Sequence, residues 1–198
     1  MPKDSALKTV AELKGKRVAF NKGSNVQYLV VKALEAAGLA YTDITPVYLT
    51  PADARAAFEK GAVDAWAIWD PFLAAAEAAI GAKTLTNGVG LVSNHQFYLS
   101  EQKFTAANPA VVDALLGAIH EIGEWAKASP AAAAKELAPI VGIPAPILEV
   151  AIGRQGYGVQ PVSPAVTAEQ QKIADTFFGL GLLPKAIVVA DVVRKSNT

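Results

Sequence analysis

The 198-residue sequence contains no cysteine and only two histidines. Without cysteine the chain forms no disulfide bond, no thiolate nucleophile and no cysteine-ligated metal site, and the absence is compatible with an oxidising or a reducing compartment. Neither His95 nor His120 belongs to an H-E-x-x-H motif or has a second histidine as a partner. We therefore expect no metal site and no cofactor.

The chain also lacks an excess of charge of either sign, because Lys plus Arg and Asp plus Glu number 18 each. No basic run carries interleaved aromatic residues, so a nucleic-acid partner is not expected. The phosphate-binding motifs G-x-x-x-x-G-K-S/T and G-x-G-x-x-G are absent as well, which argues against nucleotide binding.

The sequence has no long apolar run. Every apolar run falls well short of the roughly 20 residues that a bilayer span requires, so we expect no membrane-spanning helix. The first five residues lack the apolar core of a secretory signal. We expect any export signal either to lie upstream of Met1 or never to have existed.

What the sequence does contain is 52% hydrophobic residues, enough for one large domain or two small ones. Residues 18–20 predict a short buried strand, and Gly23 predicts a tight turn after it. Ser24 followed by Gln27 has the spacing of a helix capping box. The N–H groups at the start of such a helix, including that of Asn25, would form a site for an anionic oxygen group. The alternative is that Ser24 caps the helix and binds nothing.

Two more strand–helix units follow. Their strands are predicted at 46–49 and 63–69, and the helices of the three units at 26–37, 51–60 and 72–80. This alternation predicts an α/β fold with a parallel sheet. Ligands of such sheets bind beyond the carboxyl ends of the strands, so the loops at 21–24, 50–52 and 69–71 should share one edge.

Beyond residue 100 the strand pattern ends, after a last extended segment at 96–99. Helices are predicted at 109–125, 130–137, 144–154 and 164–180. We therefore expect an α/β lobe over residues 1–99 and a mostly helical part over residues 100–198.

Four stretches of the sequence stand out together: A-F-N-K-G-S-N-V-Q-Y-L, D-A-R-A-A-F-E-K-G-A-V-D-A-W-A-I-W-D-P-F, S-N-H-Q-F-Y-L and R-Q-G-Y-G-V-Q-P. They resemble the aliphatic sulfonate-binding proteins, which are solute receptors of ABC importers. The resemblance implies a type II periplasmic-binding-protein fold, in which two α/β lobes trap a small organic anion such as an alkanesulfonate. It also implies a transporter permease as partner and a periplasmic location.

The chain departs from that family at its start. By resemblance, residues 1–99 match the second lobe, and residues 100–198 would complete a first lobe whose opening strands are missing. Helices that normally cover those strands then expose apolar side chains, so we expect the chain to self-associate or the helices to collapse onto one another.

The resemblance also points to ligand-binding residues. Gly23, Ser24 and Asn25 match the family's anion-binding loop, and three sulfonate oxygens suit several N–H donors and a hydroxyl. Trp69, at the end of a predicted strand, is placed to pack against an alkyl chain, while Trp66 is assigned to the core.

Three polar residues complete the set of candidates. Asp70 precedes a proline at a helix start, so an N-cap role competes with ligand contact. Asn94 and His95 lie just before the extended segment that would form a hinge strand, where either could hydrogen-bond a bound anion.

Three function classes remain open at this point. A binding protein without catalysis is favoured, because no nucleophile lies in a recognisable triad or paired-carboxylate arrangement. An enzyme that resembles thiamine-pyrimidine synthases would have His95 as its acid–base residue. The third possibility is an effector-binding module of a regulator.

Overall fold

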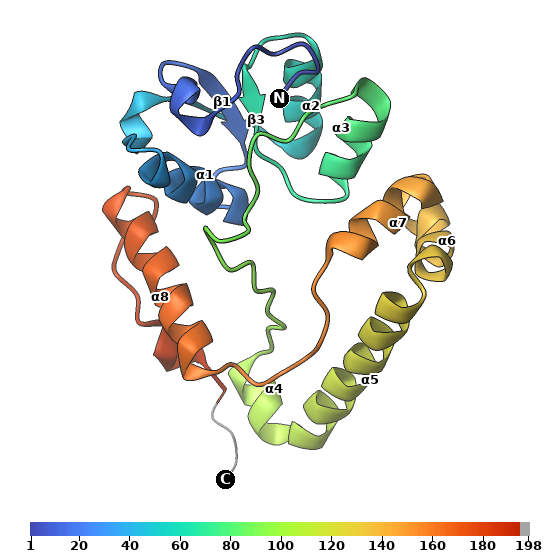
Figure 1. Cartoon of the computed structure of the whole chain (residues 1–198). Helices are drawn as coiled ribbons and strands as arrows, with labels where there is room; N and C mark the ends of the chain where they lie inside the picture. The colour runs from blue at the N-terminus through green and yellow to red at the C-terminus, as the bar shows by residue number, and fades with distance from the viewer. Residues whose placement is uncertain (195–198) are drawn as a thin grey trace. The chain divides into compact units, whose positions relative to one another are not determined.

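The computed structural model describes residues 1–194 and divides the chain into two compact units (Figure 1). The first unit comprises Met1–Asn94 together with the segment that begins at Val162, and the second comprises His95–Pro161. The division predicted from the sequence differs, because it places all residues after 99 in one part. The difference arises at the C-terminal helix, which packs on the first unit.

A three-stranded parallel sheet forms the centre of the first unit, with strand order β2–β1–β3. The strands are β1 (Arg17–Phe20), β2 (Thr45–Tyr48) and β3 (Ala65–Trp66). The predicted parallel α/β sheet and its three neighbouring strands are thereby confirmed. Because all three strands run the same way, their carboxyl ends meet at one edge of the sheet.

The third strand is much shorter than the predicted 63–69. Only Ala65 and Trp66 pair with β1, and the flanking bonds are Asp64 N–H to Arg17 O and Ala67 N–H to Ala19 O. The next residues have no ladder to join, because β1 itself ends at Phe20. The predicted strand length was therefore wrong, and the residues up to Trp69 form a loop.

Helices α1 (Asn25–Ala36), α2 (Pro51–Glu59) and α3 (Phe72–Ile80) follow the three strands in turn (Figure 1). Short 3₁₀ turns, η1 (Val10–Leu13) and η2 (Tyr41–Asp43), lie before β1 and β2. Two of these helices begin with a side-chain cap, and the cap at Ser24 is the one that the sequence predicts. The Ser24 side chain accepts a hydrogen bond from Gln27 N–H, and that of Thr50 accepts one from Asp53 N–H.

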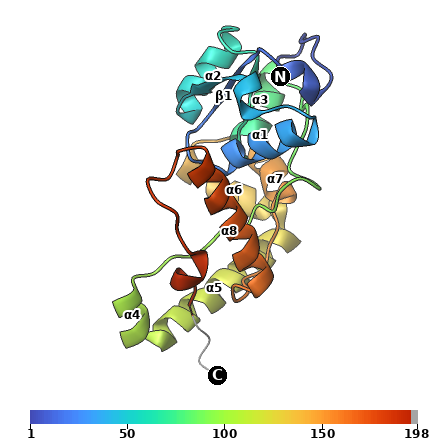
Figure 2. The same ribbon diagram turned by 90° about the vertical axis from the view of Figure 1, so that its left-hand side faces the viewer.

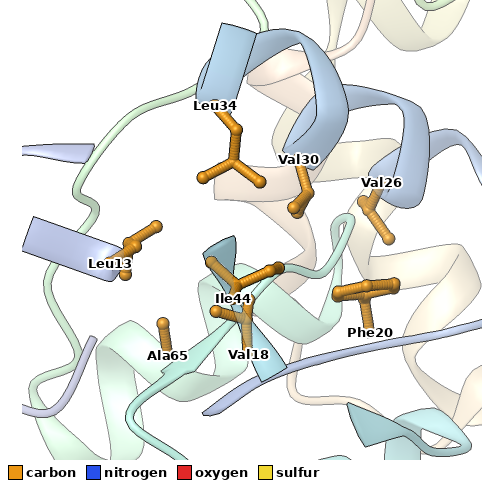
Figure 3. Packing of buried hydrophobic residues seen from close by; sticks show 8 residues of the cluster. All are labelled: Leu13, Val18, Phe20, Val26, Val30, Leu34, Ile44 and Ala65. Carbon is orange, nitrogen blue, oxygen red and sulfur yellow. The ribbon is translucent and has the colours of Figure 1, made fainter. Parts of the chain in front are cut away.

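The core of the first unit lies between α1 and the sheet. Figure 3 shows Val26, Val30 and Leu34 of α1 pointing toward Val18 and Phe20 of β1. Phe20 and Leu34 are fully buried. A second cluster, formed by Ala19, Ala54, Phe58 and Val63, packs between β1 and α2. Both clusters hold β1 in the middle, and so fix the loop that follows it.

Helix α8 (Pro164–Gly179) and the 3₁₀ turn η3 (Val189–Val192) also belong to the first unit. Figure 2 shows α8 beside α1, and the Phe177 ring meets that of Tyr28 edge-on with centroids 6.3 Å apart. Phe177 is buried by this contact, whereas its neighbour Phe178 is exposed.

The second unit is helical, with α4 (Gln102–Ala107), α5 (Pro109–Ala128), α6 (Pro130–Val141) and α7 (Ala145–Arg154). Its small core lies between α6 and α7 and contains Ala133, Ala134, Leu148 and Ile152. No strand forms between α3 and α4 in the described structure, so the extended segment predicted at 96–99 pairs with no ladder.

Within residues 1–194, no single helix is long and apolar enough to cross a membrane. Helices α6 and α7 reach that composition only as a pair, and the chain bends by 120° at their junction.

Candidate functional site

The loop between β1 and α1 is held by its own side chains. Gly23 has a positive φ of 72°, which glycine adopts without steric cost. The Ser24 hydroxyl donates a hydrogen bond to Asn21 O at 2.6 Å and accepts one from Gln27 N–H at 3.4 Å. Ser24 is therefore a helix cap whose hydroxyl proton is already engaged, and ligand contact by its side chain stays a prediction.

The backbone beyond that cap still offers donors. Among residues 1–194, the N–H groups of Ser24, Asn25 and Val26 donate to no protein acceptor. They lie at the positive end of the α1 dipole and at the carboxyl edge of the sheet. Three N–H groups without a protein acceptor in this position suit an anion with several oxygens. The hydrogen-bond donors available to an anion are thus mainly backbone N–H groups and not the Ser24 hydroxyl.

Asn94 lies beside this helix start, although it is distant in sequence. Its Oδ1 atom accepts a hydrogen bond from Asn25 Nδ2 at 2.9 Å, and both side chains are exposed. The structure therefore brings together four of the predicted site residues: Gly23, Ser24, Asn25 and Asn94.

Trp69 and Asp70 follow β3, on the same edge of the sheet. The Trp69 side chain packs against the core cluster around Phe20, and its ring meets that of Phe72 at 6.4 Å. The Asp70 carboxylate accepts a hydrogen bond from Ala74 N–H at 3.0 Å, in the first turn of α3. Both residues thus have structural contacts of their own, and ligand contact stays a prediction for each.

His95 belongs to the second unit, where its exposed ring lies 6.4 Å from that of Phe97. His120 of α5 accepts a hydrogen bond at Nδ1 from Val159 N–H at 3.3 Å, in agreement with a structural role. Across the described residues, no group of three or more His, Asp or Glu side chains is placed to hold a metal ion.

Several residues around the loop could not be identified from the sequence. Lys22 places its ammonium group 5.5 Å from the centre of the Tyr48 ring, which adds a positive charge beside Gly23. Gln27 was recognised only as a capping residue, but its side chain is fully buried and binds both Gly23 and Tyr41. Tyr48 hydrogen-bonds Tyr41 in turn. These contacts join segments too far apart in sequence for a local pattern to reveal them.

A parallel sheet with an anion-competent helix start at its carboxyl edge defines a class of small-molecule-binding fold. The chain superposes on the periplasmic aliphatic sulphonate binding protein SsuA of Escherichia coli with a TM-score of 0.93 and 39% identity, over 98% of this chain and 63% of that one. The alkanesulfonate-binding protein SsuA of Xanthomonas axonopodis pv. citri, bound to MOPS, gives a TM-score of 0.90 and 41% identity, over 98% and 68%. The fold is therefore that of periplasmic sulfonate-binding proteins.

In sequence, residues 1–133 match the family described as NMT1/THI5 like, and the chain belongs to this family. A protein of Escherichia coli (strain K12), whose name assigns it provisionally to aliphatic sulfonate binding, is 42% identical over 185 residues, which are 93% of this chain. The chain spans 58% of the length of that relative. The resemblance to aliphatic sulfonate-binding proteins is thereby confirmed.

Proposed function

We propose that the chain provides the anion-binding part of a substrate-binding component of an ABC importer, and that its substrates are aliphatic sulfonates. The observation that carries the proposal is the set of N–H groups of Ser24, Asn25 and Val26, which have no protein acceptor in the described structure and lie at the positive end of α1. A sulfonate presents three oxygens and one negative charge, which match these donors. The names of the similar proteins support the same substrate class.

The proposal includes binding without chemical turnover. No nucleophile in the sequence belongs to a recognisable catalytic motif. In this scheme the chain acts in the periplasm, delivers its ligand to a transporter permease, and receives further ligand contacts from a second lobe. Trp69, Asp70, Asn94 and His95 are the side chains proposed to approach the ligand beyond the backbone donors.

NMR titration of the 198-residue chain with ethanesulfonate tests the proposal. Binding at the loop predicts amide shifts that saturate at Ser24, Asn25 and Val26, while amides of α2 and α7 stay unchanged. Diethyl sulfone is the matched control ligand, because it has sulfonyl oxygens but no charge, and it should cause no saturable shift. Equal responses to both compounds, or no response to ethanesulfonate, would contradict the proposal.

Self-association is a second part of the proposal. Helix α5 contains no buried residue, and its exposed large apolar side chains include Leu115, Ile122 and Trp125. We propose that these side chains are covered by another copy of the chain when no other partner is present.

A further inference from the structure

A series of hydrogen bonds leads from the anion-binding loop through the buried Gln27 side chain to the hydroxyls of Tyr41 and Tyr48. Gly23 N–H donates to Gln27 Oε1 at 2.6 Å, and Gln27 Nε2 donates to the Tyr41 hydroxyl oxygen at 2.9 Å. The Tyr41 and Tyr48 hydroxyls lie 3.0 Å apart. These four residues come from the loop, α1, η2 and β2, so the series joins separate elements.

Gln27 is the centre of this series and is an unusual core residue. Its exposed fraction is 0%, although its neighbours in the core cluster are apolar. Burying an amide costs free energy unless its donors and acceptor are bonded, and an apolar side chain would avoid that cost. The role of the Gln27 amide therefore lies in its hydrogen bonds and not in its packing.

The chemistry of the partners fixes how the amide is oriented. Gly23 N–H can only donate, so the amide oxygen must face the loop and Nε2 must face Tyr41. The Tyr41 hydroxyl accepts that bond, and either hydroxyl can donate in the bond between Tyr41 and Tyr48. Burial, followed by the neighbouring Tyr48 hydroxyl, raises the pKa of Tyr41, so the phenol keeps its proton at neutral pH.

We infer that Gln27 and Tyr41 are positioning residues for the anion-binding loop. Gln27 holds the Gly23 N–H, and this bond orients the peptide groups that carry the Ser24, Asn25 and Val26 donors. Tyr41 holds Gln27 in the orientation that the bond requires. The inference rests on the proposed function for the role of the loop, but the positioning itself is a property of the ligand-free chain.

Amide hydrogen exchange of the ligand-free 198-residue chain tests the positioning. In Gln27→Met, which keeps the length of the side chain and removes both hydrogen bonds, exchange at Gly23 should accelerate about tenfold. Tyr41→Phe should also accelerate exchange at Gly23, although Tyr41 does not contact the loop. Exchange at Val31, in the interior of α1, serves as the internal reference for global stability in every variant.

Tyr157→Phe is the matched control. It also removes one phenol hydroxyl and one hydrogen bond, from Tyr157 to Ile152 O at 3.0 Å in the second unit. Its ratio of Gly23 to Val31 exchange should equal that of the wild type. A purely structural role for Gln27 and Tyr41 would accelerate both amides together and leave the ratio unchanged, and that result would overturn the inference.

Titration with ethanesulfonate separates this inference from the proposed function. If the wild type binds, Gln27→Met should bind about tenfold more weakly while Tyr157→Phe binds like the wild type; equal affinities would overturn the inference. If the wild type shows no binding, the proposed function fails, and the exchange ratio alone decides the positioning. Tyr41→Phe, which keeps the ring packed on Phe20, provides the same test if Gln27→Met does not fold.

Discussion

Arg17 and Asp64 join the first strand to the approach of the third strand by a two-pronged ion pair. Arg17 Nε lies 3.1 Å from Asp64 Oδ2, and Arg17 Nη2 lies 3.0 Å from Asp64 Oδ1. The same carboxylate accepts a hydrogen bond from the Arg17 backbone N–H at 2.8 Å. Because β3 contributes only two residues to the sheet, this pair adds a side-chain link to the backbone bonds that hold β3 in register.

Replacing Asp64 with Asn should lower the thermal stability of the chain and make that stability depend less on pH in the acidic range. The hydrogen bond from the Arg17 side chain is the main cause that lowers the pKa of Asp64. Since the pKa is lower in the folded chain, the carboxylate stabilises the fold above its unfolded pKa of about 4, and this stabilisation is lost as the pH falls through the folded value. Melting curves at pH 3 to 6 should show the wild type losing more stability on acidification than Asp64→Asn.

Arg17→Met is the control for this pair, because it removes the partner and leaves the carboxylate. It should also flatten the acid dependence, since Asp64 then titrates closer to its ordinary range. Wild-type and Asp64→Asn curves that run parallel across the whole pH range would show that the pair contributes nothing to stability.

A second prediction separates the ligand role of the α1 start from its structural role. Asn25→Asp places a carboxylate among the free N–H groups, where the helix dipole should stabilise it by about 0.3–1 kcal/mol. Asn94 can turn its amide to donate to the new carboxylate. The variant should therefore melt no lower than the wild type, yet lose the amide response to ethanesulfonate, because the added charge occupies and repels the site.

Ala165→Asp is the matched variant for that experiment. It adds an acidic residue to the first turn of α8, whose Ser163 cap resembles that of α1. It should leave the ethanesulfonate response unchanged. A loss of response in both variants would point to net charge as the cause, and would remove the α1 start from the proposal.

The affinity of the chain alone is a third prediction. A small anion needs donors and apolar walls on both sides to offset its lost freedom and desolvation, and the loop at Ser24 supplies one side. Calorimetry with alkanesulfonates should give little heat, while NMR detects weak binding at millimolar concentrations. A micromolar dissociation constant would mean that one side suffices, or that two copies of the chain complete the site.

Local signals carried most of what could be predicted. Ser24 caps its helix as the sequence predicts, because a cap depends on a side chain and a backbone group three residues apart, and Thr50 and Ser163 cap their helices in the same way. The parallel direction of the strands followed from the repeated strand–helix pattern, and both the sheet and its carboxyl edge were predicted correctly, whereas the strand order β2–β1–β3 was not predicted.

Long-range contacts could not be predicted in the same way. The length of β3 depends on where its neighbour β1 ends, which the residues of 63–69 do not encode. The packing of Phe177 on Tyr28 places α8 in the first unit, and no local pattern announces it. Gln27 has the spacing of a capping residue, but its burial and its bond to Tyr41 depend on how η2 folds over α1.

The last prediction concerns the exposed face of α5. Val111, Leu115, Ile122 and Trp125 follow one another at intervals of four, seven and three residues along this helix, so they form one stripe, and each has at least 44% of its surface exposed. Apolar area in contact with water costs roughly 25 cal/mol per Å², so covering the stripe with another copy is favourable. Sedimentation of the 198-residue chain should show dimers or larger species, together with binding of a hydrophobic dye.

Substitutions on the stripe should reverse this association. Leu115→Lys and Ile122→Lys should shift the chain toward monomers and reduce dye binding. Glu124→Gln is the control, because it changes the net charge by the same amount but lies two residues from Ile122, on another side of the helix. It should sediment like the wild type. If the wild-type chain is a monodisperse monomer at all concentrations and binds no dye, the stripe needs no partner. The proposed self-association would then be contradicted, because it requires these apolar side chains to be buried between copies of the chain.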